Sequence, residues 1–172
     1  MKLTALLAPL ALAGAAAADS AAIVAAVNAA AEGTTALGAA VSNWKGDLLG
    51  TLPIVTESTA LLVTVKKGAR TAEESDEMDF YGVLDVAHAV TDLTGVVNAT
   101  LTALVDAKPK FDRLLMSPLI FATLELQKRA TGEMSEAIVA KVPEQLQDLA
   151  RDIAQPIDAS FELALDEYHP FH

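Results

Sequence analysis

The chain has 172 residues, no cysteine, a hydrophobic fraction of 52% and a formal net charge of −11. This acidity argues against nucleic acid or an anionic membrane surface as a partner, because both repel a strongly negative protein. An exported protein without disulfides must be held together by its apolar core alone.

The first 18 residues have the features of a secretory signal peptide. Lys2 precedes a short apolar run, and Ala16 and Ala18 occupy the small-residue positions of a cleavage site before Asp19. The run is too short to span a membrane, and we expect no transmembrane segment after it. Residues 19–172 are therefore expected to form the secreted domain. The alternative is that the apolar run is the first helix of the mature fold.

Apolar residues then recur at the spacing of amphipathic helices along almost the whole chain. The first helix is expected to face inward with Ile23, Val27, Ala30, Leu37, Val41 and Trp44, and to end at Lys45-Gly46-Asp47. The second, with Pro53 in its first turn, is expected to face inward with Leu52, Val55, Leu62 and Val65. Lys66, Lys67 and Gly68 are expected to end it.

The third helix is predicted from about residue 76 to 106, a length of roughly 45 Å. Thr71 and Glu74 have capping-box spacing, with Ser75 as a second candidate cap. The acidic run 73–79 is interpreted as favourable charge at a helix N-terminus, and the alternative is a cation or partner site. Pro109 is expected to end the helix. Its inward stripe is Val83, Val86, Val90, Leu93, Val97, Leu101 and Leu104.

After a short helical piece at 111–116, the cap Ser117 and Pro118 predict a fourth helix that ends near Lys141. Its expected apolar face is Leu119, Thr123, Leu126, Ala130, Ala137 and Val139, with Ile120 and Leu124 beside it. The last helix, bent at Pro156, is expected to face inward with Leu146, Leu149, Ile153, Ile157, Phe161, Ala164 and Tyr168. Short links predict an all-α, up-and-down bundle of about five amphipathic helices.

Motifs for chemistry are scarce. There is no cysteine nucleophile, G-x-S-x-G, H-E-x-x-H or glycine-rich phosphate loop. Asp85 and His88, and again Asp166 and His169, have the spacing of carboxylate–imidazole pairs in di-metal bundles. Such a site also needs inward Glu partners on two further helices, and the first pair falls on the back of its helix. We therefore expect no catalytic residue, no metal and no cofactor.

Two surface features have alternative interpretations. Asn98 begins the N-glycosylation acceptor Asn98-Ala99-Thr100 and lies on the flank of its helix, where a glycan is sterically feasible. Lys108, Lys110 and Arg113 gather near the end of the third helix, where cations compensate the helix dipole. The alternative is that they form a cationic mouth that holds an acyl carboxylate.

Four segments carry a family resemblance: "GTLPIVTESTALL" (50–62), "VNATLTALVDAKPKF" (97–111), "LELQKRATGEMSEAIVAKVPEQL" (124–146) and "PIDASFELALDEY" (156–168). In this order they resemble the fungal hydrophobic surface-binding protein A family, which includes cell-wall galactomannoprotein antigens. The resemblance covers nearly all of residues 19–168. It implies a helical bundle that is secreted or associated with the cell wall.

The resemblance also implies two kinds of activity. Some members adsorb to hydrophobic surfaces and help recruit secreted polyester-degrading hydrolases, and others hold fatty acids inside the bundle. This chain lacks the Ser/Thr-rich C-terminal region and anchor signal of wall-bound members, so we expect release into the medium rather than permanent wall attachment.

Side-chain volume bears on whether the bundle has an internal site. Interiors normally pack without voids, but facing stripes of Ala, Val and Thr can leave a groove, and the chain has only eight aromatic residues. Each buried methylene contributes about 0.8 kcal/mol, and association costs at least about 4 kcal/mol, so a six-carbon chain would hardly bind while about fifteen methylenes suffice for micromolar affinity.

With the resemblance added, we expect a non-enzymatic secreted protein that binds long-chain fatty acids or hydrophobic surfaces. The expected lipid-binding residues are Leu62, Val83, Val86, Val90, Val97, Leu101, Ile120, Leu124, Ile153, Ile157 and Phe161. The alternative is a structural cell-wall galactomannoprotein with a closed core and no ligand.

Overall fold

Five long helices make up almost all of the protein. The structure, a computed structural model, describes the backbone of residues 8–169 and the side chains of residues 19–169. The elements are α1 (Ala8–Asn43), α2 (Thr51–Glu74), α3 (Phe80–Arg113), α4 (Ser117–Val139), the short 3-10 helix η1 (Glu144–Leu146) and α5 (Gln147–Tyr168). No strand occurs in this described part, and the all-α prediction is confirmed. The predicted signal peptide lies outside the described side chains and stays a prediction.

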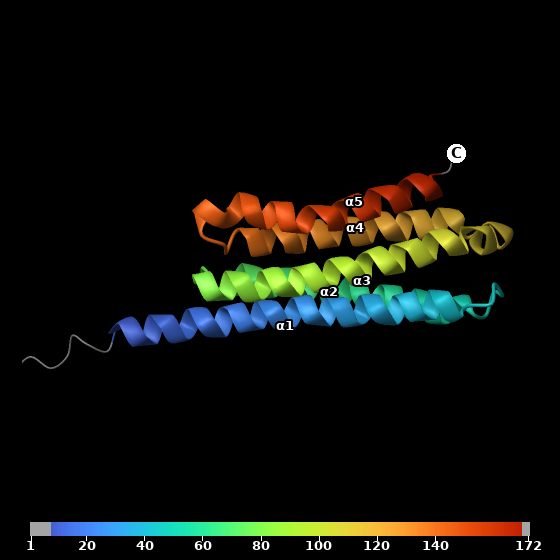
Figure 1. The fold of residues 1–172 in the computed structure, drawn as a ribbon. Helices are drawn as coiled ribbons and strands as arrows, with labels where there is room; N and C mark the ends of the chain where they lie inside the picture. The colour runs from blue at the N-terminus through green and yellow to red at the C-terminus, as the bar shows by residue number, and fades with distance from the viewer. Residues whose placement is uncertain (1–7, 170–172) are drawn as a thin grey trace, which may run out of the picture.

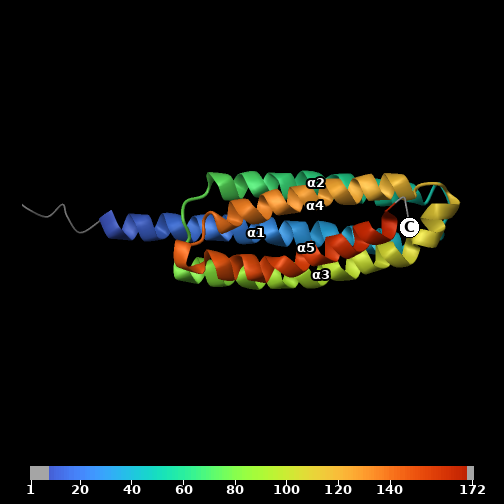
Figure 2. The same cartoon turned by 90° about the horizontal axis from the view of Figure 1, so that it is seen from above.

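The helices run up and down as predicted, and they close into a ring (Figures 1 and 2). Helix α1 packs on α2 and α3, α2 packs on α4, α3 packs on α5, and α4 and α5 pack on each other. A regular ring of five helices about 10 Å apart places each axis about 8.5 Å from the centre, against about 7 Å for a square of four. The space along the axis of a five-helix ring is therefore wider than in a four-helix bundle, and only side chains are available to fill it.

The boundary between α2 and α3 differs from the prediction. Helix α2 does not end at Gly68 but continues to Glu74, because this turn buries Ala72 in the core. Thr71 therefore lies inside α2, so the predicted capping box is wrong. The cap of α3 is Asp79, whose Oδ1 accepts a hydrogen bond of 2.7 Å from the backbone N–H of Gly82.

Pro109 does not end α3, which continues for one more turn to Arg113. A proline inside a helix removes a hydrogen bond and is unfavourable, so other contacts must hold this turn. The ring of Phe111 is fully buried here, and Lys110 Nζ donates a 2.9 Å hydrogen bond to the carbonyl oxygen of Trp44. The predicted separate piece at 111–116 is thus partly the end of α3. Helix α4 begins at Ser117 as predicted, but Met116 is its N-cap, and it ends at Val139.

The predicted inward faces of α1 and α3 are confirmed, whereas those of α2 and α4 are shifted. Leu52 and Val55 of α2 are exposed, and so are Leu119 and Leu126 of α4. The buried positions of α2 are Thr51, Ile54, Ser58, Leu61, Val65, Gly68, Ala69 and Ala72. Those of α4 are Ile120, Leu124, Gln127, Ala130, Met134, Ile138 and Val139. Both faces include polar or small residues at inward positions, and these obscure the apolar period.

Helix α5 follows its prediction in its second half. Ile157, Phe161, Ala164 and Tyr168 are buried, and Pro156 lies inside the helix as expected. Leu149, predicted to face inward, is 57% exposed. Figure 1 shows α5 curving along its length, as the predicted bend requires.

Part of α1 also resembles a membrane span by composition. Residues Asp19–Asn43 are long and apolar enough to cross a membrane by length and composition alone, with a mean hydropathy of 1.2. The sequence predicts no segment of this kind after residue 18, so this part of α1 differs from that prediction in length and composition. The apolar face of these residues packs in the core of the bundle. A helix that is buried in a protein core can have the same length and composition as a membrane span.

Candidate functional site

Two cavities lie inside the ring. Cavity 1 has a volume of about 130 Å³ and is lined by residues from all five helices, among them Leu37, Leu61, Val97, Leu101, Leu124 and Phe161. Cavity 2 has a volume of about 150 Å³, and its lining includes Val27, Val83, Val86, Val90, Ile153 and Ile157. The centre of the five-helix ring is therefore incompletely filled.

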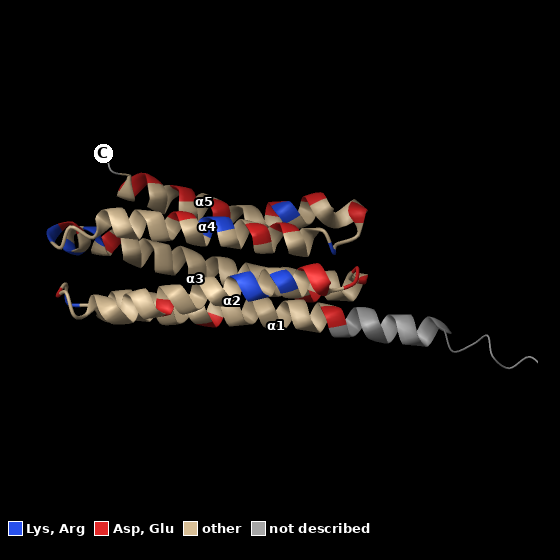
Figure 3. Ribbon diagram, turned by 180° about the vertical axis from the view of Figure 1, so that it is seen from behind, with Lys and Arg blue, Asp and Glu red and all other residues tan. Residues whose placement is uncertain are grey.

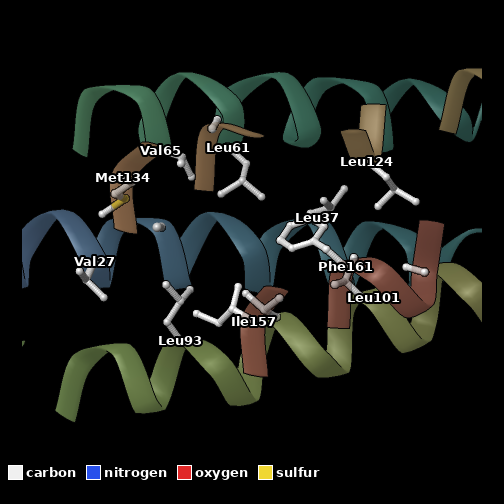
Figure 4. Packing of buried hydrophobic residues seen from close by; sticks show 14 of the residues in the cluster. Val27, Leu37, Leu61, Val65, Leu93, Leu101, Leu124, Met134, Ile157 and Phe161 are labelled. Atoms are coloured by element: carbon white, nitrogen blue, oxygen red, sulfur yellow. The ribbon is translucent and has the colours of Figure 1, made fainter. Parts of the chain in front are cut away.

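The cavities lie in tandem along the bundle. On α3, the lining of cavity 2 runs from Phe80 to Leu93, and that of cavity 1 runs from Leu93 to Leu104. At 1.5 Å per residue the two together span about 36 Å. Three residues, Leu93, Thr131 and Met134, line both cavities and so form the boundary between them. Figure 4 shows Leu93 and Met134 among the inward side chains, with Val27 on one side and Leu37 and Phe161 on the other.

The walls are almost entirely hydrocarbon. No charged residue belongs to the described lining of either cavity. The Thr100 hydroxyl of cavity 1 donates to the carbonyl oxygen of Thr34 at 3.0 Å, and the Gln127 amide donates to that of Ser58 at 2.8 Å. Among the described side chains, no buried nitrogen or oxygen lacks a partner. The surface that remains for a guest is mostly apolar, with a few serine and threonine side chains, and it suits a hydrocarbon chain.

Each cavity reaches a seam between two helices. Val55 of α2 and Leu119 of α4, which are 44% and 52% exposed, belong to the lining of cavity 1. Phe80 of α3 and Leu149 of α5, also exposed, belong to the lining of cavity 2. Lining residues that are also exposed mark the α2–α4 and α3–α5 seams as the mouths of the two cavities.

Three aromatic rings close the bundle beyond cavity 1. Phe111 stacks at a tilt on Trp44, with ring centroids 4.3 Å apart, and meets Tyr168 edge-on at 6.4 Å. The Tyr168 hydroxyl donates a 2.6 Å hydrogen bond to the carbonyl oxygen of Leu104, a residue that lines cavity 1. Burial raises the pKa of the Tyr168 hydroxyl, so it stays a neutral donor. This aromatic cluster seals one end of the apolar interior.

Ten of the eleven predicted lipid-binding residues line a cavity. Val97, Leu101, Ile120, Leu124 and Phe161 line cavity 1, and Val83, Val86, Val90, Ile153 and Ile157 line cavity 2. Leu62 lines neither, because its neighbour Leu61 takes the inward position on α2. Lining a cavity does not test binding, so the lipid-binding roles stay predictions.

The prediction missed the contribution of α1 and the boundary residues. Val27 and Leu37 of α1 line the cavities, and the apolar period of that helix had already placed both inward. Met134 was also missed, because polar and small neighbours interrupt the pattern of α4 around it.

The basic residues near the end of α3 do not reach the cavities. Lys110 caps the end of α1 through Trp44, and Lys108 pairs with Asp112 at 2.9 Å. Hydrogen bonds from Ser117 and Lys108 hold the pKa of Asp112 below its usual value. Neither these residues nor Arg113 belong to the lining of cavity 1 or 2. These contacts indicate that the basic residues stabilise the helix ends and the turn, and they do not support a cationic mouth for an acyl carboxylate.

The pair Asp85 and His88 and the pair Asp166 and His169 do not come together to form one site. Asp85 and His88 are exposed on α3, and the His169 ring packs edge-on against Phe121 with centroids 5.8 Å apart. In the described part of the chain, no three histidine or acidic side chains come together in a group that could hold a metal ion.

Asn98 is exposed on α3, while Thr100 of the same acceptor motif is buried against α1. We expect a glycan on Asn98 when the protein is made in a eukaryotic secretory pathway, attached before folding hides Thr100. Mass spectrometry before and after endoglycosidase treatment measures it. An unchanged mass would contradict this prediction.

Exposed apolar side chains gather at the end of the bundle where the α1–α2 and α3–α4 turns lie. Leu48 and Leu49 of the first turn and Leu52 at the start of α2 are 62–77% exposed, and Leu115 of the second turn is 88% exposed. Figure 3 shows the first half of α2 almost entirely uncharged, since Glu57 is the only charged residue between Thr51 and Val65. This end of the molecule therefore combines the exposed leucines and the uncharged first half of α2 with the charged residues in and beside the two turns, among them Lys45, Asp47 and Arg113.

The family model of hydrophobic surface binding protein A matches residues 20–140. The chain belongs to this family. It is 29% identical over 135 residues to cell wall mannoprotein 1 of Aspergillus fumigatus and 25% identical over 135 residues to cell wall mannoprotein 1 of Aspergillus flavus. Each match covers 78% of this chain but only 47% and 49% of the relative, so the chain spans about half the length of these relatives.

Solved structures share the fold. The crystal structure of Afmp4p in complex with palmitic acid matches with a TM-score of 0.83 and 21% identity, over 87% of this chain and 99% of that one. Ligand-binding domain 2 of the Penicillium marneffei MP1 protein, complexed with multiple arachidonic acids, matches with a TM-score of 0.80 and 17% identity, over 87% and 96%. At these identities the likeness establishes the helical fold.

Proposed function

We propose that this protein is a secreted, non-enzymatic carrier that holds a long-chain fatty acid between its helices. The observation that supports it most is the pair of apolar cavities in tandem along the bundle axis. The fatty acids bound by structures of the same fold support the same ligand class.

The size of the cavities argues for a long guest. A cavity of about 150 Å³ holds one benzene, so either cavity alone suits about six carbons. Six methylenes contribute about 5 kcal/mol, which the cost of association nearly cancels. A chain of about fifteen methylenes binds usefully only if it extends through most of the apolar interior. The proposal therefore requires the ligand to occupy both cavities.

Extraction of the purified protein with organic solvent, followed by mass spectrometry, tests this function directly. We expect co-purifying long-chain fatty acid and, after its removal, titration with hexadecanoate at micromolar affinity or better. The rival is a structural wall glycoprotein with a closed core. An extract without fatty acid, together with no heat of binding for hexadecanoate, would decide for the rival.

The absence of catalysis is part of the proposal. The described lining contains serine and threonine hydroxyls but no histidine, carboxylate or lysine that could activate one of them as a nucleophile. Hydrolysis of long-chain esters at enzyme-like rates, surviving repurification, would contradict this part of the proposal.

Adsorption to hydrophobic surfaces is a second function, and the exposed leucines beside the α1–α2 and α3–α4 turns favour it. Leu115 adopts a left-handed backbone conformation, with φ +57°, that is unfavourable for a leucine. A strained and exposed leucine brings little benefit to folding, so it is a candidate contact residue.

We expect Leu115→Asn to raise the free energy of unfolding by up to about 1 kcal/mol, because asparagine tolerates the left-handed conformation better. The same change removes an exposed isobutyl group, so less protein should adsorb to polystyrene. Urea denaturation and depletion of protein from solution by beads measure the two effects. Leu126→Asn is the matched control, because Leu126 is 51% exposed near the middle of α4 and lines neither cavity. Adsorption reduced equally by both variants would show that these turns are not the contact surface.

Location and partners follow the same proposal. Export through the predicted signal peptide would yield a protein that begins at Asp19, which N-terminal sequencing of secreted material measures; the names of the relatives point to the cell exterior or wall. The family resemblance also implies recruitment of a secreted hydrolase to the coated surface. A hydrolase that degrades a polyester film no faster with the protein present would exclude that role.

A further inference from the structure

The boundary between the two cavities has an unusual construction. Met134 of α4 is 4% exposed and lines both cavities, together with Leu93 and Thr131. Of these three, only Met134 is long, unbranched and free to change several torsions at little cost. In Figure 4 its side chain lies near Val65, across the interior from Leu93.

Gly68 of α2 provides the seat on which the tip of Met134 rests. A Cβ atom built on Gly68 would lie 2.7 Å from Cε and 2.9 Å from Sδ of Met134, distances that real Cβ contacts do not reach. The thioether therefore occupies space that exists only because residue 68 is glycine. A glycine inside a long helix weakens the helix. Close packing against the Met134 thioether explains why glycine occupies this position.

We propose that Met134 is a movable partition between the two cavities, and that its position on Gly68 sets how long an acyl chain the protein accepts. This inference rests on the proposed function. With the partition in place, each cavity accommodates a short segment only. A longer chain passes from one cavity to the other by displacing the Met134 thioether, while Leu93 and Thr131 form the fixed part of the rim.

The dependence of binding affinity on acyl chain length tests whether Met134 separates the two cavities. Each added methylene that reaches apolar surface increases affinity about fourfold. With delipidated full-length protein, we expect hexadecanoate to bind about 250-fold more tightly than dodecanoate, because the four extra carbons extend into the second cavity. Met134→Phe places a rigid ring at the boundary and should reduce this ratio to less than tenfold. Met134→Ala should retain it. Met78→Phe is the matched control, because Met78 is 2% exposed but lines neither cavity, and it should leave the ratio unchanged.

Gly68→Ala provides a test that does not depend on how well a phenylalanine is tolerated in the core. The new methyl group takes the seat and pushes the thioether toward the interior, so the ratio should fall, although alanine is the better helix former. In the Met134→Ala background the same Gly68→Ala change should have no effect, since no thioether remains to be displaced.

The outcomes separate the two proposals. A ratio that stays near about 250-fold in Met134→Phe, or a Gly68→Ala effect that is the same with and without Met134, would overturn the partition and leave the carrier function standing. If the unaltered protein binds neither acid, both proposals fail.

Discussion

Replacing Val97 by asparagine is expected to weaken hexadecanoate binding by at least about tenfold while the protein still folds. Val97 is 5% exposed, and its methyl groups face cavity 1. In a closed core, the stranded amide would cost about 1–3 kcal/mol of stability. Beside an open cavity of about 130 Å³, water can solvate the amide in the ligand-free protein, so most of that cost is avoided.

The loss of affinity follows from the same water. An acyl chain must displace it and then meets an amide in place of two methyl groups, each worth about 0.8 kcal/mol when buried. Urea midpoints and calorimetric titration with hexadecanoate measure stability and affinity separately.

Val41→Asn is the matched control for this change. Val41 is 2% exposed on α1 and lines neither cavity, so its amide would be stranded in packed core. We expect a large drop in its urea midpoint and an unchanged affinity in the molecules that remain folded. If Val97→Asn behaves in this way too, the stripe on α3 is ordinary core and the ligand lies elsewhere.

The sequence was sufficient to predict the helical class and the inward faces of α1 and α3, because those faces consist of regularly spaced aliphatic residues. The predicted inward faces of α2 and α4 were wrong in part, because polar and small residues occupy several inward positions there. Ser58, Gly68 and Gln127 occupy inward positions there, and none of them contributes to an apolar period. The structure accommodates them through partners on other helices, such as Ser58 with Gln127, which no pattern along one helix reveals.

Helix boundaries failed where tertiary contacts outweighed local signals. Pro109 is a strong stop signal, yet the burial of Phe111 carries α3 past it. The cavities illustrate the same limit. Ten of their lining residues could be named from the sequence and the family resemblance, but their division at Leu93 and Met134 depends on how five helices close into a ring.

Phe111→Ala is expected to lower the free energy of unfolding by about 3–5 kcal/mol, which is a large fraction of the total stability of a domain this size. Phe111 is 0% exposed and joins the end of α1, through Trp44, to the end of α5, through Tyr168. Its removal leaves a cavity and also withdraws the contact that offsets the unfavourable Pro109. Urea denaturation of the delipidated protein measures the loss, and Tyr168→Phe is the control. That variant keeps the ring and loses only the hydrogen bond to Leu104, for about 0.5–1.5 kcal/mol.

Ligand should restore part of this stability. Tyr168 connects the two regions, because its ring contacts Phe111 and its hydroxyl donates a hydrogen bond to the carbonyl oxygen of Leu104, which lines cavity 1. A ligand that binds only the folded state stabilises it by about 2.7 kcal/mol at 100 times its dissociation constant. Hexadecanoate at that excess should therefore raise the urea midpoint of Phe111→Ala markedly, and the affinity of the folded variant should be kept or increased, since the acyl chain gains room. A midpoint unaffected by hexadecanoate, in a variant that still folds without it, would mean that the folded variant does not bind hexadecanoate. Binding would then depend on the packing of the aromatic cluster, and the acyl chain would gain no room from the removal of Phe111.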